Sequence, residues 1–298
     1  MKSLDDLQRG LLSGDFKVLA RTLTLVENDI EPSSTLLKSI RIKNIPVVGI
    51  TGPPGAGKST LVNAIINSFL KEDKRIAILA VDPTSPFNFG SLLGDRVRMA
   101  QQFNKGNVFI RSVATRGALG GVSVKTLEML DIIKASNFDL ILVETVGVGQ
   151  SEVEIAGLAD KTIVVLVPES GDEIQNIKSG LMEIAQAFVV NKADRDGATT
   201  FANNLKKMVH QQTEIIPVFK TVADKNEGIE ELLQWILQPM ELADDRKRFL
   251  FADKALKLIQ HYKMKDIDQK KLRRAIDEAF DKGSFNVYRF TEEYLKHS

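Results

Sequence analysis

Residues 45–70 read IPVVGITGPPGAGKSTLVNAIINSFL. A short β-branched run opens this stretch, GPPGAGKST follows it, and apolar residues at helical spacing close it. The central residues match GxxxxGK[ST] between a strand and a helix, which predicts a phosphate-binding loop. We expect this loop to contact a nucleotide through Gly52, Pro53, Pro54, Gly55, Ala56, Gly57, Lys58, Ser59 and Thr60.

The chemistry of such a loop follows from its residue types. Glycines let the backbone curl until its N–H groups face the phosphates, Lys58 neutralises the β- and γ-phosphate oxygens, and Ser59 offers a hydroxyl to Mg²⁺. Lys58 is therefore a candidate catalytic residue, and Ser59 a candidate metal ligand. A glycine-rich turn with a surface lysine is the plainer interpretation, which the flanking strand and helix disfavour.

Four more β-branched runs punctuate the chain: RIAILAV at 75–81, DLILVET at 139–145, KTIVVLVP at 161–168 and AFVVNKAD at 187–194. Segments with helical patterning separate them. Nearly continuous apolar runs indicate strands buried on both faces. We therefore predict an α/β fold with three layers and a mostly parallel sheet, with ligands at the carboxyl ends of its strands.

The segments on either side of this region are helical in pattern. Apolar residues recur at helical spacing before residue 44, and the chain after Pro239 is charged and helical without another strand-like run. We predict an N-terminal helical extension (1–44), a nucleotide-binding domain (45–239) and a C-terminal helical arm (240–298).

NKAD, at 191–194, ends one of the predicted strands and matches the guanine signature NKxD. Asp194 would accept hydrogen bonds from N1–H and the amino group of guanine, which adenine cannot supply. Hydrogen bonds to charged groups contribute roughly 1.5 to 3 kcal/mol each, so losing both would disfavour ATP by several orders of magnitude. Asn191 and Lys192 are the other candidate contacts. An ordinary exposed turn remains the alternative.

ETVG, at 144–147, ends another predicted strand. Proteins with phosphate-binding loops place an acidic residue near Mg²⁺ and a glycine near the γ-phosphate at such a strand end, here Glu144 and Gly147. Asp82 ends the strand RIAILAV and is a second carboxylate within reach. Asp82 and Glu144 are candidate Mg²⁺ ligands, although capping of a strand end explains either one alone.

Val148 follows Gly147, where small Ras-like GTPases carry the glutamine that orients the attacking water. Because this glutamine is missing, we expect slow intrinsic hydrolysis that a partner or a dimer must complete.

Composition narrows the class of protein. The chain has 298 residues, with 40 Lys and Arg against 39 Asp and Glu and a net charge of +1, so we expect no nucleic-acid or membrane partner. It contains no cysteine, which excludes disulfides and thiolate metal sites. The first residues resemble neither a secretory signal nor a transit peptide, and no apolar run reaches the roughly twenty residues of a membrane span. We expect a cytoplasmic protein.

Longer motifs identify a family. From about Leu36 to Gly228 the chain closely resembles the MeaB/ArgK family of GTPases, chaperones of adenosylcobalamin-dependent methylmalonyl-CoA mutase that include the human methylmalonic aciduria type A protein. The marks are GPPGAGKST, VDPTSPFNFGSLLGDRVRM, RGALGGVSVKT, ETVGVGQSE, PESGDEIQNIKSG and NKAD. One departure is Thr84, in Asp82-Pro83-Thr84-Ser85, where the family usually has DPSS.

The resemblance implies several roles. Asp82 and Asp95 fall in the first switch region, with Asp95 approaching Mg²⁺ as the switch closes, and Glu144 starts the second switch. Asp95 and Glu144 join Lys58 as candidate catalytic residues. Residues 171–178 match a further switch loop that links nucleotide state to the mutase, with Asp172 and Lys178 as its charged positions. A helix capped by Asp172 is an equally good interpretation of that segment. The implied partners are GTP or GDP, Mg²⁺ and an adenosylcobalamin-dependent acyl-CoA mutase.

The resemblance also makes the segment from Ala243 a dimerisation arm. Its apolar residues could form a self-complementary seam between two copies: Phe249, Leu250, Ala255, Leu256, Leu258 and Ile259. Packing of the arm against its own nucleotide-binding domain is the alternative.

Three other functions share this fold class. A nickel metallochaperone GTPase would need Cys or His ligands, but the chain has no cysteine and only the scattered His210, His261 and His297. NKAD argues against an ATP-dependent small-molecule kinase. The seven methionines do not cluster as in a signal-recognition GTPase.

Overall fold

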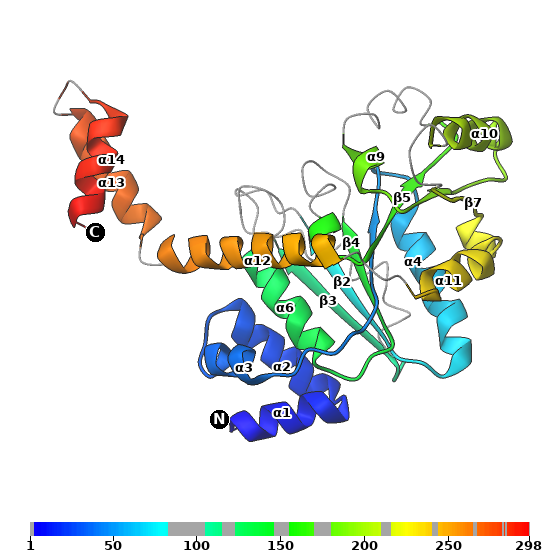
Figure 1. Ribbon diagram of the computed structural model, residues 1–298, viewed down its shortest axis with the longest axis horizontal. Coiled ribbons are helices and arrows are strands. Elements are labelled where there is room, and N and C mark those ends of the chain that lie inside the picture. The colour runs from blue at the N-terminus through cyan, green and yellow to red at the C-terminus, as the bar shows by residue number, and fades with distance from the viewer. Residues whose placement is uncertain are drawn as a thin grey trace. The chain divides into compact units, whose positions relative to one another are not determined.

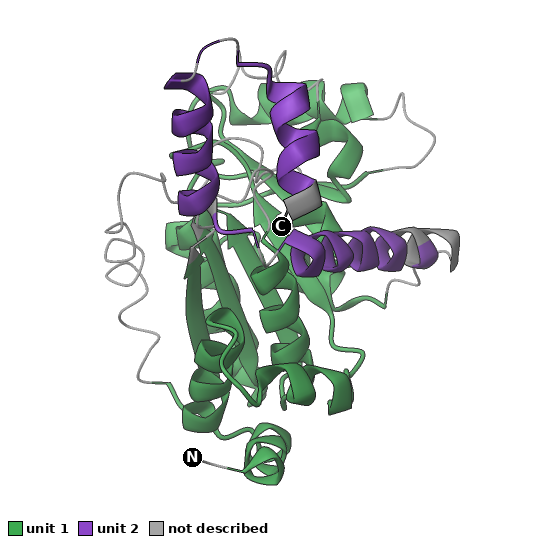
Figure 2. Cartoon of the chain, turned by 90° about the vertical axis from the view of Figure 1, so that its left-hand side faces the viewer, with its two compact units in different colours: residues 1–242 green, residues 243–298 purple. Residues whose placement is uncertain are grey.

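The computed structural model describes residues 3–82, 105–114, 123–145, 155–169, 180–209, 216–239, 244–264, 267–281, 283 and 285–297. Four of the predicted site residues lie outside these ranges: Asp95, Gly147, Asp172 and Lys178. The side chain of Asp82 is also outside the description. The chain divides into two compact units, Met1–Leu242 and Ala243–Ser298, which Figure 2 colours separately. The domain boundaries at 44 and 239 stay predictions.

A seven-stranded sheet, with the order β3-β2-β4-β1-β5-β6-β7, forms the centre of the first unit, and all its neighbouring strands pair in parallel. The α/β fold expected from the sequence is thus confirmed (Figure 1). The strands are β1 Val47–Thr51, β2 Ile76–Asp82, β3 Val108–Ala114, β4 Leu140–Thr145, β5 Lys161–Leu166, β6 Ala187–Val190 and β7 Val218–Lys220. Five of these match the β-branched runs, whereas β3 and β7 were not predicted.

Helices cover both faces of this sheet. On one face lie α4 (Lys58–Phe69) and α11 (Ile229–Leu237), packed on alternate side chains of the central strands. On the other face lie α6 (Val124–Lys134) and, beside β5 and β6, α10 (Ala198–Val209) with the short α9 (Leu181–Ile184). Since both faces are covered, residues throughout β1, β4 and β5 are buried, as their apolar runs predicted.

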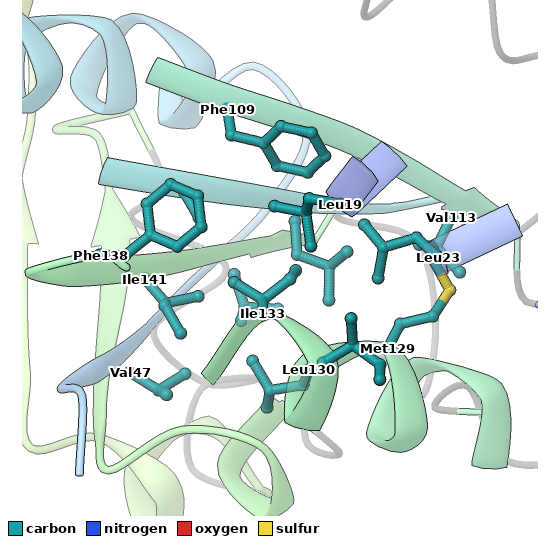
Figure 3. Close-up of a cluster of buried hydrophobic side chains, with 14 of the residues drawn as sticks. Leu19, Leu23, Val47, Phe109, Val113, Met129, Leu130, Ile133, Phe138 and Ile141 are labelled. Carbon is teal, nitrogen blue, oxygen red and sulfur yellow. The ribbon is translucent and has the colours of Figure 1, made fainter. Parts of the chain in front are cut away.

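The N-terminal extension forms α1 (Leu4–Ser13), α2 (Phe16–Glu27) and α3 (Ser33–Ser39). Ser3 and Asp15 cap the first two helices by accepting hydrogen bonds from backbone N–H groups. Leu19 and Leu23 of α2 share one core with Ile133 of α6 and Val47 of β1 (Figure 3). The extension therefore belongs to the same hydrophobic core as the sheet.

Polar contacts also tie this extension to the sheet layer. The guanidinium of Arg75 lies 4.8 Å from the Phe16 ring centre and donates to the Gly14 carbonyl at 2.6 Å. Arg111 of β3 pairs with Glu27 at 2.5 Å. Lys125, at the start of α6, pairs with both Asp29 and Glu128, and although burial lowers its pKa, these hydrogen bonds outweigh burial and raise it.

The second unit consists of α12 (Asp244–Met264), α13 (Gln269–Asp281) and α14 (Val287–His297). Phe285 contacts Phe280 and Phe290, with ring centres 5.8 Å apart in each pair, which joins α13 to α14. Of the residues expected to form a seam on α12, Ala255, Leu256 and Ile259 are exposed. Nowhere in the described ranges is a helix both long and apolar enough to cross a membrane.

Candidate functional site

The loop Gly52–Gly57 joins β1 to α4 at the carboxyl end of a central strand, as the sequence predicted. Its glycines hold conformations that other residues rarely adopt, with φ of +138° at Gly52, +79° at Gly55 and +84° at Gly57. A Cβ added at Gly52 would lie 2.1 Å from the Val165 carbonyl oxygen on β5. The loop therefore needs glycine both for its backbone angles and for its fit against the neighbouring strand.

Lys58 begins α4 and is only 6% exposed. Its ammonium donates hydrogen bonds to the Gly52 and Pro53 carbonyl oxygens at 2.7 and 3.0 Å. The side chain therefore folds back over the loop that the sequence assigned to phosphate. A cation held at this position is suited to neutralise phosphate oxygens.

Ser59 and Glu144 meet beside this lysine. The Ser59 hydroxyl donates to the Glu144 carboxylate at 2.6 Å, and Glu144 is 5% exposed. Parallel pairing of β1 with β4 sets Glu144 opposite Ile50, close to the start of the loop. Two residues that lie 85 positions apart in the chain thus form one oxygen-lined corner.

This corner fits Mg²⁺, because a hydroxyl and a carboxylate are hard oxygen ligands and Mg²⁺ usually takes few ligands from the protein itself. Asp82 ends β2, one residue beyond the pairing of Val81 with Thr145, so its backbone lies at the same edge of the sheet. Within the described part of the chain, no group of three or more His, Asp or Glu side chains could hold a metal ion.

Asn191 connects the two ends of the site. It is buried after β6, and its amide nitrogen donates to the Ala56 carbonyl of the loop at 2.9 Å. Its amide oxygen accepts from the Thr221 hydroxyl at 3.1 Å and from the Ala223 N–H at 3.2 Å. Lys192, with φ of +53°, donates to the Gly55 carbonyl at 2.8 Å. The NKAD segment therefore holds the phosphate-binding loop directly.

The sequence interpretation missed the segment after β7, which contains Thr221, Ala223 and Lys225. The turn η4 (Ala223–Lys225) brings this segment beside NKAD, with a backbone hydrogen bond of 3.0 Å from Ala193 to Thr221. A strand of only three residues, VFK, precedes it. Three residues are too few for a strand to be recognised from periodicity. Had β7 been recognised as a strand, it would have pointed to the segment that follows it.

Asp194 lies at the outer end of the site. Its carboxylate pairs with the Lys225 ammonium at 2.8 Å, with the aspartate side chain 41% exposed and the lysine 53% exposed. The hydrogen bond from Lys225 lowers the pKa of Asp194 and, in turn, raises the pKa of Lys225. Next to Asp194, Arg195 pairs with Glu169, and that hydrogen bond lowers the pKa of Glu169.

The structure thus brings together Gly52 to Ser59, Glu144, Asn191 and Lys192, with Asp194 at the outer edge, around one end of the sheet. Asp95, Gly147, Asp172 and Lys178 lie outside the described residues, so their assignments stay predictions.

Comparison with known families gives a long match. The family described as "Methylmalonyl Co-A mutase-associated GTPase MeaB" matches residues 19–275. That range includes most of α2, all seven strands and both ends of the site.

Individual relatives agree with this match. A protein of Pyrococcus horikoshii named as a GTPase is 45% identical over 262 residues, which cover 84% of this chain and 80% of that protein. The mouse methylmalonic aciduria type A homolog, named as mitochondrial, is 39% identical over 209 residues, covering 65% of this chain and 50% of its own length.

The likeness to one solved structure extends over nearly the whole chain. The crystal structure titled LAO/AO transport system kinase has a TM-score of 0.67 and 26% identity, with 99% of this chain and 97% of that chain covered.

Proposed function

Because this chain belongs to the MeaB family of methylmalonyl-CoA mutase-associated GTPases, we propose that its GTPase cycle controls the adenosylcobalamin cofactor of methylmalonyl-CoA mutase or a related acyl-CoA mutase. The GTPase activity is supported by the family and by relatives that are named as GTPases. The observation that best supports the nucleotide part is the contact of Asn191 and Lys192 with the phosphate-binding loop, which joins a guanine signature to a phosphate site.

We propose the following roles for the residues of the site. Backbone N–H groups of the loop and the Lys58 ammonium bind the phosphates, while Ser59 and Glu144, with Asp82 and Asp95, hold Mg²⁺. Bound Mg²⁺ would neutralise charge that develops on the phosphate oxygens. Gly147 lies near the γ-phosphate, and Asp194 accepts the two donors of guanine. Hydrolysis is slow in isolation, because Val148 stands where the water-orienting glutamine would be.

In this proposal, the surface that the protein presents to the mutase changes with the bound nucleotide. Loops that contact the γ-phosphate are ordered by it in GTPases generally and released on hydrolysis. We propose that residues 171–178, with Asp172 and Lys178, present this change to the mutase. Since coupling is reciprocal, GTP must then alter mutase affinity by the same factor by which the mutase alters GTP affinity.

Calorimetric titration tests the nucleotide assignment first. GDP and a non-hydrolysable GTP analogue, with Mg²⁺ present, should bind the parent protein tightly, and ATP should not. Asp194→Asn should weaken guanine-nucleotide binding about a hundred-fold or more, because it removes a charged acceptor from two hydrogen bonds. The neighbouring exposed Asp196 supplies the matched control, and Asp196→Asn should bind like the parent. Equal binding of ATP and GTP would instead support a small-molecule kinase.

Titration of the mutase tests the coupling separately. We expect methylmalonyl-CoA mutase to bind the GTP-analogue form and the GDP form with different affinities. Equal affinities would refute control by nucleotide state, even if the guanine site itself were correct.

We also propose that the second unit forms a homodimer. On α12, Phe251 is 70% exposed, Leu256 54% and Ile259 58%, and their spacing puts them on one side of the helix. Sedimentation should show a dimer for the parent and a monomer for Leu256→Glu, because a charge would be buried in the seam. Lys257→Gln changes the charge by the same amount on the other side of α12, and it should leave the dimer intact.

A further inference from the structure

The turn that contains Lys225 has a well-defined place beside the base-binding segment. Val222 and Glu227 exchange backbone hydrogen bonds of 3.1 and 3.2 Å across it, and Asn226 closes it in a left-handed conformation with φ of +59°. The Ala223 N–H donates to Asn191 at 3.2 Å. Because both ends of this turn are hydrogen-bonded, the Lys225 backbone is held next to NKAD.

From this position the lysine side chain reaches the carboxylate that we assign to guanine. The Lys225 ammonium donates to Oδ2 of Asp194 at 2.8 Å. A second cation nearby, Arg195, makes an ion pair with Glu169, on the segment that follows β5. One oxygen of the base-reading carboxylate is thus engaged by a cation of the protein itself.

Bases differ in how many carboxylate oxygens they need. Guanine brings two donors, N1–H and the 2-amino group, and therefore uses both oxygens of an aspartate. Hypoxanthine, the base of inosine nucleotides, brings only N1–H and needs one oxygen. Hypoxanthine can therefore bind Oδ1 of Asp194 while Lys225 keeps Oδ2, whereas the 2-amino group of guanine has to share Oδ2 with the Lys225 ammonium.

We infer that Lys225 is a specificity-determining residue of the base site, because its ammonium competes with the guanine 2-amino group for Oδ2 of Asp194. This inference rests on the proposed role of Asp194 as the guanine acceptor. Lys225 lowers the preference for guanine over hypoxanthine, and it does so without contacting the phosphates. An exposed ion pair of this kind typically changes an equilibrium by up to about five-fold, which sets the size of the effect.

The test compares GDP with inosine diphosphate in competition against one labelled guanine nucleotide. In Lys225→Ala, the ratio of the two dissociation constants should shift toward GDP by about two- to five-fold. Lys220→Ala removes another exposed lysine, at the end of β7, and should leave the ratio unchanged. If Lys225 only supports the local structure, both nucleotides should lose affinity by the same factor, and the inference is wrong.

The dependence of this ratio on ionic strength provides a second test, on the unmodified protein. Exposed charges are screened as ionic strength rises, so the parent's preference for GDP over inosine diphosphate should increase toward that of Lys225→Ala. The ratio in the variant should change less. A parent ratio that does not respond to salt would contradict competition by a charged group.

Asp194→Asn distinguishes a failure of the proposed guanine site from a failure of the proposed role of Lys225. If it leaves GDP binding intact, then the proposed guanine site is wrong. If it abolishes discrimination while Lys225→Ala leaves the GDP preference unchanged, then the guanine site stands and only the role of Lys225 is refuted.

Discussion

The two ends of the proposed nucleotide site differ in burial. At the phosphate end, Lys58 and Glu144 are almost fully enclosed and hydrogen-bonded to Gly52 and Ser59. At the base end, Asp194 and Lys225 are about half exposed and paired with each other. Charged contacts that are shielded from water act far more strongly than exposed ones, which solvent and salt screen.

This difference separates two tasks. The buried end holds its groups in place before any ligand arrives, which suits the stabilisation of charge during hydrolysis. The exposed end contributes little to stability until a base binds and excludes water from the carboxylate. Substitutions at the phosphate end should therefore affect rate or folding, and those at the base end should affect ligand choice.

The largest effect should come from Glu144→Gln. Loss of the carboxylate beside Ser59 removes a candidate Mg²⁺ ligand, and we expect GTP hydrolysis to fall about 10²- to 10³-fold. Single-turnover hydrolysis at several Mg²⁺ concentrations measures this. Glu128→Gln removes another buried carboxylate, one paired with Lys125 on α6, and should keep the parent rate if burial alone is not the cause. An unchanged rate in Glu144→Gln would show that Glu144 is not a Mg²⁺ ligand needed for hydrolysis.

The next largest effect should be that of Gly52→Ala, which should lower the stability of the fold. The added Cβ would meet the Val165 carbonyl at a backbone angle unfavourable to alanine, and we expect about 3 kcal/mol or more of lost unfolding free energy. Gly55 has a similar left-handed angle but nothing within 4 Å of its Cβ position. Gly55→Ala should therefore cost only about 1–2 kcal/mol. Equal urea midpoints for the two variants would show that the contact with β5 does not matter.

Asn191→Ala tests the connection between the two ends. It leaves the Ala56 carbonyl and the Ala223 N–H without the partners they have now, and each unsatisfied buried group costs about 1–3 kcal/mol. We expect the unfolding free energy to fall by about 2–6 kcal/mol and both GDP and pyrophosphate to bind more weakly. Asn203→Ala, on the exposed side of α10, is the control. If pyrophosphate affinity is unchanged, Asn191 does not position the phosphate loop.

The smallest effect should be the acid dependence of the Asp194–Lys225 pair. The pKa of Asp194 is lowered in the folded protein, so the stabilisation is present above its ordinary value of 3.8 and is lost as pH falls through the lower folded value. A small difference in urea midpoint between the parent and Lys225→Ala should therefore exist at pH 6 and vanish in strong acid. A difference that persists after Asp194 is protonated would have another source.

Much of the fold could be predicted, and the exceptions have physical reasons. β1, β4 and β5 are buried on both faces, so their sequences are continuous apolar runs. β3 carries the charged Arg111 at its centre, paired with Glu27 of the extension, which interrupts such a run. β7 has only three residues. Helical spacing in the extension identified an apolar face, but it could not show that this face shares a core with α6 and the sheet.

The sequence by itself determined the motif of the phosphate-binding loop, the guanine signature and the order of five of the strands along the chain. These are local features, because glycine conformations, short-range spacing and runs of β-branched residues act within a few neighbouring positions. Only the tertiary structure decided that Ser59 meets Glu144, that Asn191 joins the loop to the segment after β7, and that Lys225 holds an oxygen of Asp194. Those contacts link residues 30 or more positions apart, and they exist because parallel strands end at one edge of a sheet.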